Sequence, residues 1–243
     1  MLSIYKKEIR TFFSSLTGYV VIGVFLTILG LFMWVFPDTS LLEYDYATMD
    51  QLFSIAPLIF LFLIPAITMK SFAEEKQRGT LEFLYTKPLE GWEIIWGKFL
   101  ANFTLVAIAL LPTLLYYYSV YQLGSPKGNL DTGAIIGSYI GLFFLAGAFV
   151  AIGMFASAIS DNQIVAFILG TLICFMVHWA FLYLANLEFW GPKVSNFIQS
   201  LGLNYHYASI SKGALDTRDL VYFISVVLFF VWLTQWRVEK SRA

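Results

Sequence analysis

Charged side chains gather in one short segment of this chain, residues 71–89, which we call the elbow. Ser71 and Glu74 have the spacing of a capping box, Gly79 suits a left-handed helix C-cap, and Pro88 ends a second short helix. The rest of the chain has few groups that do chemistry. A rigid, charged helical turn is suited to binding a soluble partner, and we expect recognition rather than catalysis here.

Residues that could catalyse a reaction or bind a metal are sparse elsewhere. Cys174 and His178 share one helix face at i and i+4, which would suit a soft metal ion, but a lone histidine in an apolar helix is more often a packing residue. Ser157 with His178 is the only conceivable nucleophile and base. Neither G-x-S-x-G nor G-x-x-x-x-G-K-[ST] occurs. We therefore expect no catalytic residue, metal, cofactor or nucleic-acid partner, and any ATPase must be a separate chain.

Composition places the chain in the membrane. Of its 243 residues, 59% are hydrophobic and 13% are charged, whereas soluble domains carry about 25% charged residues. Six apolar runs are long enough to cross a bilayer as helices: 18–36, 52–69, 99–118, 133–157, 164–184 and 220–236. None of these ranges contains Asp, Glu, Lys or Arg, which argues against proton- or sodium-driven transport. We predict an all-α integral membrane protein with a bundle of six transmembrane helices.

Basic residues indicate the orientation of this bundle. With the N-terminus inside, the inner segments hold Lys6, Lys7, Arg10, Lys70, Lys76, Arg78, Lys87, Lys98, Arg237, Lys240 and Arg242. The outer segments hold only Lys127, Lys193, Lys212 and Arg218. By the positive-inside rule both termini and the elbow are cytoplasmic.

The residues before the first span, 2–16, predict an amphipathic helix at the membrane surface. Its apolar face carries Leu2, Tyr5, Ile9, Phe12, Phe13 and Leu16, and its polar face carries Lys6, Lys7, Arg10 and Ser14. Such a helix contacts the lipid bilayer, and it could also brace the elbow.

Two further patterns concern packing. Gly133, Gly137 and Gly141 recur at spacing four in the fourth span, which lets another helix approach closely, from this chain or from a second subunit. Residues 185–219 are apolar but interrupted by Pro192 and Gly202, which predicts one or two short re-entrant or interfacial helices on the outer side.

The elbow resembles a signature of ABC exporter permeases of the second type, the ABC-2 membrane family. Residues 75–88 fit the pattern E-x-x-x-G-T-x-E-x-L-x-x-x-P. Members of that family also have six spans, an N-terminal amphipathic helix, and short outer helices between the last two spans. The resemblance covers essentially the whole chain. Within the family, the stretches near Tyr5 and at residues 213–223 look most like the gliding-motility-associated permease subunit of bacteria.

The resemblance implies a complex in the bacterial inner membrane. Two permease chains pair, the second being either this chain again or a related larger membrane subunit. Each inserts its elbow into one of two cytoplasmic ABC ATPase subunits, which bind ATP and Mg. Carried over by position, the ATPase-coupling residues are Phe72, Glu74, Glu75, Arg78, Gly79, Thr80, Leu81, Glu82 and Leu84, with Gly79 as hinge. The chain itself is then a non-enzymatic permease.

Two alternatives remain open at this point. A membrane scaffold could use the same elbow to recruit a cytoplasmic ATPase or a motility or secretion partner without moving a substrate. An intramembrane enzyme is a remote alternative, since it would depend on Ser157 and His178 alone.

Overall fold

The structure is a computed structural model that describes residues 1–37, 39–41, 47–80, 90–187, 189–214 and 216–240. These residues form helices and turns, with no strand among them. Six of the helices are long and apolar enough to cross a membrane. The predicted all-α bundle of six spans is confirmed.

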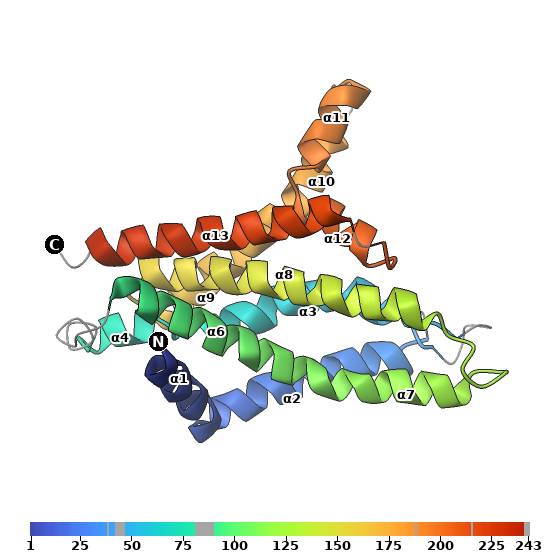
Figure 1. The fold of residues 1–243 in the computed structure, drawn as a ribbon, viewed down its shortest axis with the longest axis horizontal. Coiled ribbons are helices and arrows are strands. Elements are labelled where there is room, and N and C mark those ends of the chain that lie inside the picture. Colours follow the sequence, from blue (N-terminus) through green and yellow to red (C-terminus); the bar gives the residue numbers. More distant parts are fainter. Residues whose placement is uncertain (38, 42–46, 81–89, 188, 215, 241–243) are drawn as a thin grey trace.

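The spans follow one another along the chain, and the longest connection, between the last two, contains two short helices (Figure 1). The first three are α2 (Leu16–Trp34), α3 (Asp50–Thr68) and α6 (Gly91–Leu110), and α6 continues through the turn η1 (Leu111–Thr113) into α7 (Leu114–Leu123). The others are α8 (Thr132–Ile159), α9 (Gln163–Phe175) with η2 (Met176–Ala180) and α10 (Phe181–Ala185), and α13 (Thr217–Lys240). The shorter helices are α1 (Leu2–Ser14), α4 (Ala73–Gln77), α11 (Pro192–Gln199) and α12 (Leu203–Ile210).

The N-terminus, the end of α13 and α4 lie at the same end of the bundle, which we call the terminal end (Figure 1). The connection from α7 to α8 lies at the opposite end, the distal end. α1 lies across the terminal end, packed on α6 and on the start of α2. It occupies most of the range 2–16, where the sequence predicts an amphipathic helix.

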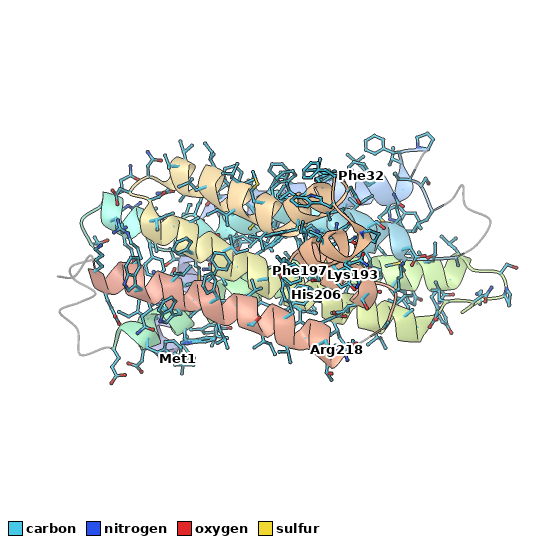
Figure 2. All side chains as sticks on the ribbon, turned by 90° about the horizontal axis from the view of Figure 1, so that it is seen from above. Met1, Phe32, Lys193, Phe197, His206 and Arg218 are labelled. Atoms are coloured by element: carbon cyan, nitrogen blue, oxygen red, sulfur yellow. The ribbon has the colours of Figure 1, made fainter. Side chains whose placement is uncertain are left out.

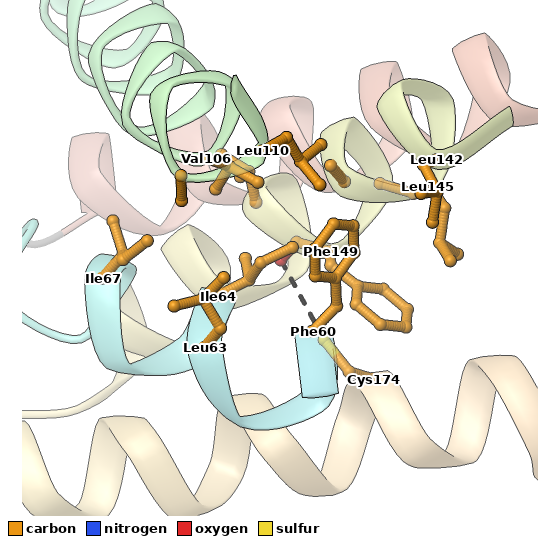
Figure 3. Packing of buried hydrophobic residues seen from close by; sticks show 14 of the residues in the cluster. Phe60, Leu63, Ile64, Ile67, Val106, Leu110, Leu142, Leu145, Phe149 and Cys174 are labelled. Atoms are coloured by element: carbon orange, nitrogen blue, oxygen red, sulfur yellow. Dashed lines mark hydrogen bonds between the residues drawn. The ribbon is translucent and has the colours of Figure 1, made fainter. Parts of the chain in front are cut away.

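α8 is the central helix of the core, in contact with α3, α6, α9 and α13. Phe60 and Ile64 of α3 and Phe149 of α8 are fully buried and pack together in a cluster that α6 completes with Val106 (Figure 3). Cys174 of α9 is also buried there, with its Sγ 4.0 Å from the carbonyl oxygen of Phe149. Interlocking aromatic and branched side chains, rather than polar bonds, hold the middle of the bundle.

The glycines of α8 contact elements of the same chain. A Cβ on Gly137 would lie 2.9 Å from the Cα of Gly213, and a Cβ on Gly141 would lie 2.7 Å from the Ile210 side chain. Gly133 has only Asp131 nearby. The absence of a side chain at Gly137 and Gly141 therefore lets α12 and the turn after it pack closely on α8. At these two positions the packing partner belongs to the same chain and not to a second subunit.

Proline affects the spans unequally. Pro112 lies in η1, where the helix passes from α6 into α7 through a tighter turn. Pro57 and Pro65 lie inside α3, which continues as one helix through both of them. The boundary of the third span also differs from the expectation, because α6 begins at Gly91 rather than at Phe99 and so includes Lys98.

α11 and α12 lie within residues 185–219, where one or two short helices are predicted. α10 and α11 project sideways from the bundle (Figure 1). Phe197 and Lys193 of α11 lie near the middle of the long axis of the molecule (Figure 2). Phe197 is 65% exposed. An apolar side chain so exposed on a laterally projecting helix is typical of a segment that contacts lipid or another chain.

Candidate functional site

The described part of the elbow, residues 71–80, begins in the turn after α3 and contains the helix α4 and the turn to Thr80. Phe72 and Ala73 have no exposed surface, and they anchor the beginning of α4 in the bundle beside α8 and α9. Arg78 and Gly79 are exposed. One side of the elbow is therefore built into the bundle, and the other is free to contact a partner.

The capping box predicted for Ser71 and Glu74 is wrong. The Ser71 hydroxyl instead accepts a hydrogen bond from the Asn102 side-chain amide at 2.8 Å, and Glu74 pairs with Arg78. The cap comes from another helix. The backbone N–H groups of Phe72 and Ala73 each donate to the Ser157 hydroxyl at 3.0 Å, and Ser157 donates to the Met69 carbonyl at 2.9 Å.

Ser157 thus fixes α4 to α8 through three backbone groups. A helix begins with N–H groups that lack partners inside the helix, and they must be satisfied when they are buried. A local capping residue would attach α4 only to its own chain segment. A cap supplied by α8 makes α4 move together with the central helix of the core.

We expect Ser157→Ala to destabilise the protein by about 2 kcal/mol, because it leaves two buried N–H groups without an acceptor. The free energy of unfolding, measured by denaturant titration in mild detergent, checks this. Ser119→Ala is the matched control, since Ser119 is only half-buried and its hydroxyl donates to the Leu115 carbonyl of its own helix. Equal stability of the two variants would contradict the capping role.

A buried ion network forms a second attachment of the elbow. Lys98 of α6 is 1% exposed, and its Nζ lies 2.9 Å from Glu8 Oε1, 3.0 Å from Glu75 Oε1 and 2.7 Å from the Ser71 carbonyl oxygen. Lys7 Nζ lies 2.9 Å from the same Glu75 oxygen. A buried ammonium is tolerated only when it is paired and hydrogen-bonded, and here all three of its N–H groups have acceptors.

This network joins three elements that are far apart in sequence: α1 through Lys7 and Glu8, α4 through Glu75, and α6 through Lys98. Glu75, a predicted contact to the ATPase, is therefore engaged inside the chain and is only 12% exposed. Glu74 of α4 pairs at 2.7 Å with Arg78, the residue that follows α4, and that pair is more exposed than Glu75. The outward-facing charges of the described elbow are those of Glu74 and Arg78.

Lys76 makes a third attachment, at the far side of α4. Its Nζ donates to the Ala158 carbonyl and lies 3.5 Å from Asp161, which follows α8. α4 is thus held at its beginning by Ser157, along its length by Lys98, and near its end by residues at the end of α8.

Gly79 has a φ of +64°, the left-handed conformation predicted for it. No heavy atom lies within 4 Å of the position that a Cβ would take, so the backbone conformation, and not lack of space, favours glycine there. The N–H and hydroxyl of Thr80 both donate to the Glu75 carbonyl, at 2.9 and 3.2 Å. Leu81, Glu82 and Leu84 lie outside the described residues.

Some of the predicted interfacial residues of α1 contact the bundle, and others are exposed on the opposite side of the helix. Tyr5 donates to the Thr104 hydroxyl at 3.2 Å, and Lys7 belongs to the ion network. Ile9, Phe12 and Phe13 are half-buried, whereas Lys6 and Arg10 are exposed. The bundle side of α1 also includes two residues that the sequence pattern did not single out. These are Ile4, which packs on Gly97, and Glu8.

Sequence reasoning missed Lys98 and Glu8 as parts of this site. Lys98 was placed outside the third span, so its burial was not expected. A signal did exist, because Ile4 and Glu8 are four residues apart and so share a helix face. An acidic residue among the lysines of that helix indicates a cation on the surface against which it packs.

The two residues considered as nucleophile and base, Ser157 and His178, lie apart in the structure. The Ser157 hydroxyl is occupied by backbone groups at the terminal end, whereas His178 packs against Phe149, two helical turns away along α8. Cys174 is buried beside the Phe149 carbonyl. Within the described ranges, no group of three or more His, Cys, Asp or Glu residues could hold a metal ion.

The arrangement of six spans, an amphipathic N-terminal helix and an anchored elbow can be compared with known proteins. The family model for ABC-2 family transporter proteins matches residues 2–234. The chain belongs to this family. A comparison with curated protein sequences finds no match.

Membership of the ABC-2 family makes the chain a membrane permease subunit of an ABC transporter, of a kind that is generally not catalytic itself. ABC-2 permeases work with ABC ATPase partners. The family match includes α1, the elbow, the first five spans and most of the sixth, so the anchors described above lie within an ABC-2 permease domain.

Proposed function

We propose that this chain is the permease subunit of an ATP-driven exporter, with the elbow as the element that receives movement from the ATPase. The observation that carries this is the attachment of α4. Ser157, Lys98 and Lys76 tie it to α8, α1 and α6, while Arg78 and Gly79 are exposed. A force applied to the exposed side of the elbow therefore acts on three helices at once.

Coupling of this kind needs a rigid link rather than a flexible one. When the ATPase closes around nucleotide, it displaces α4, and the bundle responds by rigid-body movement of packed helices. The elbow then lies on the cytoplasmic side of a bacterial inner membrane, and both termini lie there too, as the distribution of basic residues supports. ATP and Mg bind to the ATPase chains, two per complex.

The finer assignment in the proposal is a permease associated with bacterial gliding motility. It rests on the similarity of the stretches near Tyr5 and at residues 213–223. In such a complex the second permease is a related larger membrane subunit, or else a second copy of this chain.

The test is purification of the tagged chain from its native membranes in mild detergent, with mass spectrometry of the partners and an ATPase assay on the same eluate. We expect an ABC ATPase at one copy per permease, with a second permease chain identified in the same sample. Absence of an ABC ATPase would contradict the proposal and favour a membrane scaffold.

Gly79→Pro tests the elbow itself. Proline fixes φ near −65° and removes the N–H that donates to the Lys76 carbonyl, so the turn after α4 cannot form as it is. We expect an unchanged amount of protein in the membrane and a loss of about tenfold or more in copurified ATPase activity. Gly79→Asn is the control, because asparagine tolerates the left-handed conformation.

Glu82→Arg, a charge reversal in the part of the elbow outside the described residues, is expected to act in the same direction as Gly79→Pro. Normal partner binding and ATPase activity in both variants would show that the elbow does not couple the two subunits.

A further inference from the structure

A cavity of about 530 Å³ opens between α1, the terminal-end residues of α2 and α3, the elbow and α6. Its lining includes the carboxylates of Glu8, Glu74 and Glu75. Its volume lies in the range of small-molecule pockets, about 300–1,000 Å³. The deeper wall is apolar and comes from the spans, with Val21, Ile67 and Leu105. Hydroxyl groups of Ser15 and Thr17 line it at the junction of α1 and α2.

Lys70 is the cation in this cavity for which the described residues supply no carboxylate partner. The other two lining cations are both paired, Lys7 with Glu75 and Arg78 with Glu74. Lys70 Nζ donates to the Thr17 hydroxyl at 3.0 Å and has no other hydrogen-bond acceptor in the described part of the chain. An ammonium has three N–H donors, so two remain for a ligand.

The hydroxyls beside Lys70 form a connected set. Thr17 Oγ1 lies 2.8 Å from Ser15 Oγ, and Ser15 donates to the Phe12 carbonyl at 2.9 Å. Hydroxyl hydrogens rotate, so these groups can turn to donate to an anionic oxygen placed next to the ammonium. A cation with two adjacent hydroxyls suits an anion that has several acceptor oxygens, such as a phosphate group.

The position of this set decides which phosphate it suits. Thr17 is the second residue of α2, and Lys70 is the second residue after α3, so two membrane spans end at the same level here. The headgroup phosphates of a bilayer lie at that level, and lysines near the bilayer surface attract anionic lipids. The apolar wall below, from Val21 to Leu105, continues into the spans, where acyl chains lie.

We propose that this cavity binds the headgroup of a phospholipid, with Lys70 and the Thr17 hydroxyl on the phosphate and the apolar wall against the glycerol and upper acyl chains. The inference is independent of the coupling function proposed above. A free phosphate ester would use the polar groups but leave the apolar wall uncovered. An acidic segment of a soluble protein would have to reach the level of the spans.

The experiment measures lipid binding to the purified, delipidated full-length chain by native mass spectrometry, with phosphatidylglycerol in detergent as the probe. We expect Lys70→Gln to weaken binding about fivefold, the factor that corresponds to about 1 kcal/mol for one lysine at a bilayer surface. Thr17→Val, which keeps the shape of the side chain, should weaken binding in the same direction.

Lys6→Gln is the matched control, because Lys6 is exposed on α1, does not line the cavity and carries the same charge. Lipid binding that is unchanged in Lys70→Gln, or reduced equally in Lys6→Gln, overturns the proposal. Displacement of the lipid by an equal concentration of glycerol 3-phosphate or inorganic phosphate overturns it in favour of a soluble phosphate ligand. Loss of the lipid on binding of the ATPase, with partner binding weakened by Lys70→Gln, overturns it in favour of an acidic protein segment.

Discussion

Replacement of Lys98 by methionine is expected to lower the free energy of unfolding by about 3 kcal/mol. The substitution keeps most of the side-chain volume but removes the positive charge. Glu8 and Glu75 would then face each other without the cation that now lies within 3.0 Å of both. The expected loss is at the lower end of the range for a broken buried ion pair, because these carboxylates are 20% and 12% exposed.

Denaturant titration in mild detergent measures this loss, and Lys6→Met is the control, since it removes an exposed charge from α1. A double-mutant cycle with Glu75→Gln gives a sharper test. If Lys98 and Glu75 interact, the loss in the double variant is smaller than the sum of the single losses, by at least about 0.5 kcal/mol. Additive losses would mean that the contact contributes nothing to stability.

The same variant bears on coupling. Lys98 contacts residues of α1 and α4 but is not exposed to a partner, so its loss should loosen the elbow without changing the surface that an ATPase contacts. In the purified complex we expect Lys98→Met to retain the ATPase while the stimulation of ATP hydrolysis falls. The proposed Gly79→Pro effect differs, because there the partner itself is lost.

A second large effect is expected at the turn between α12 and α13. Gly213 has a φ of +83°, and a Cβ there would lie 2.7 Å from the Cα of Ala134 in α8. Gly213→Ala therefore combines about 1–2 kcal/mol of backbone strain with a steric clash against backbone of about 1–3 kcal/mol. We expect a loss of about 3 kcal/mol in the free energy of unfolding.

Gly191→Ala is the control for this prediction. Gly191 precedes α11 with a φ of −68°, and no heavy atom lies within 4 Å of the position of its Cβ. It should lose little stability by the same denaturant titration. A Gly213→Ala variant as stable as Gly191→Ala would show that α8 and the turn do not pack as closely as the structure has them.

The sequence predicted the number of spans because this depends on a local property. Each span is a continuous apolar run, and the bilayer requires each such run to form a helix that satisfies its own backbone groups. The left-handed turn after α4 is also a local feature, because the glycine at position 79 favours that backbone conformation by itself. The family signature of residues 75–88 is likewise contiguous.

The attachment of the elbow depends on residues that are distant in the chain. The N-terminus of α4 is capped by Ser157 of α8, not by the neighbouring Ser71, because burial of Phe72 and Ala73 brings their N–H groups to that helix. The pattern of residues 71–74 contains no information about which helix lies beside them. A local rule therefore gave a capping box where tertiary packing supplied another acceptor.

What the sequence by itself determined is the membrane class, the six spans, the position of the elbow and the family. Only the tertiary structure decided that Glu75 points into the protein, that Lys98 is buried between α1 and α4, and that Gly137 and Gly141 admit α12. The physical reason is that burial and ion pairing depend on which surfaces meet. Helix periodicity specifies a face, but the partner of that face is set by how the whole bundle packs.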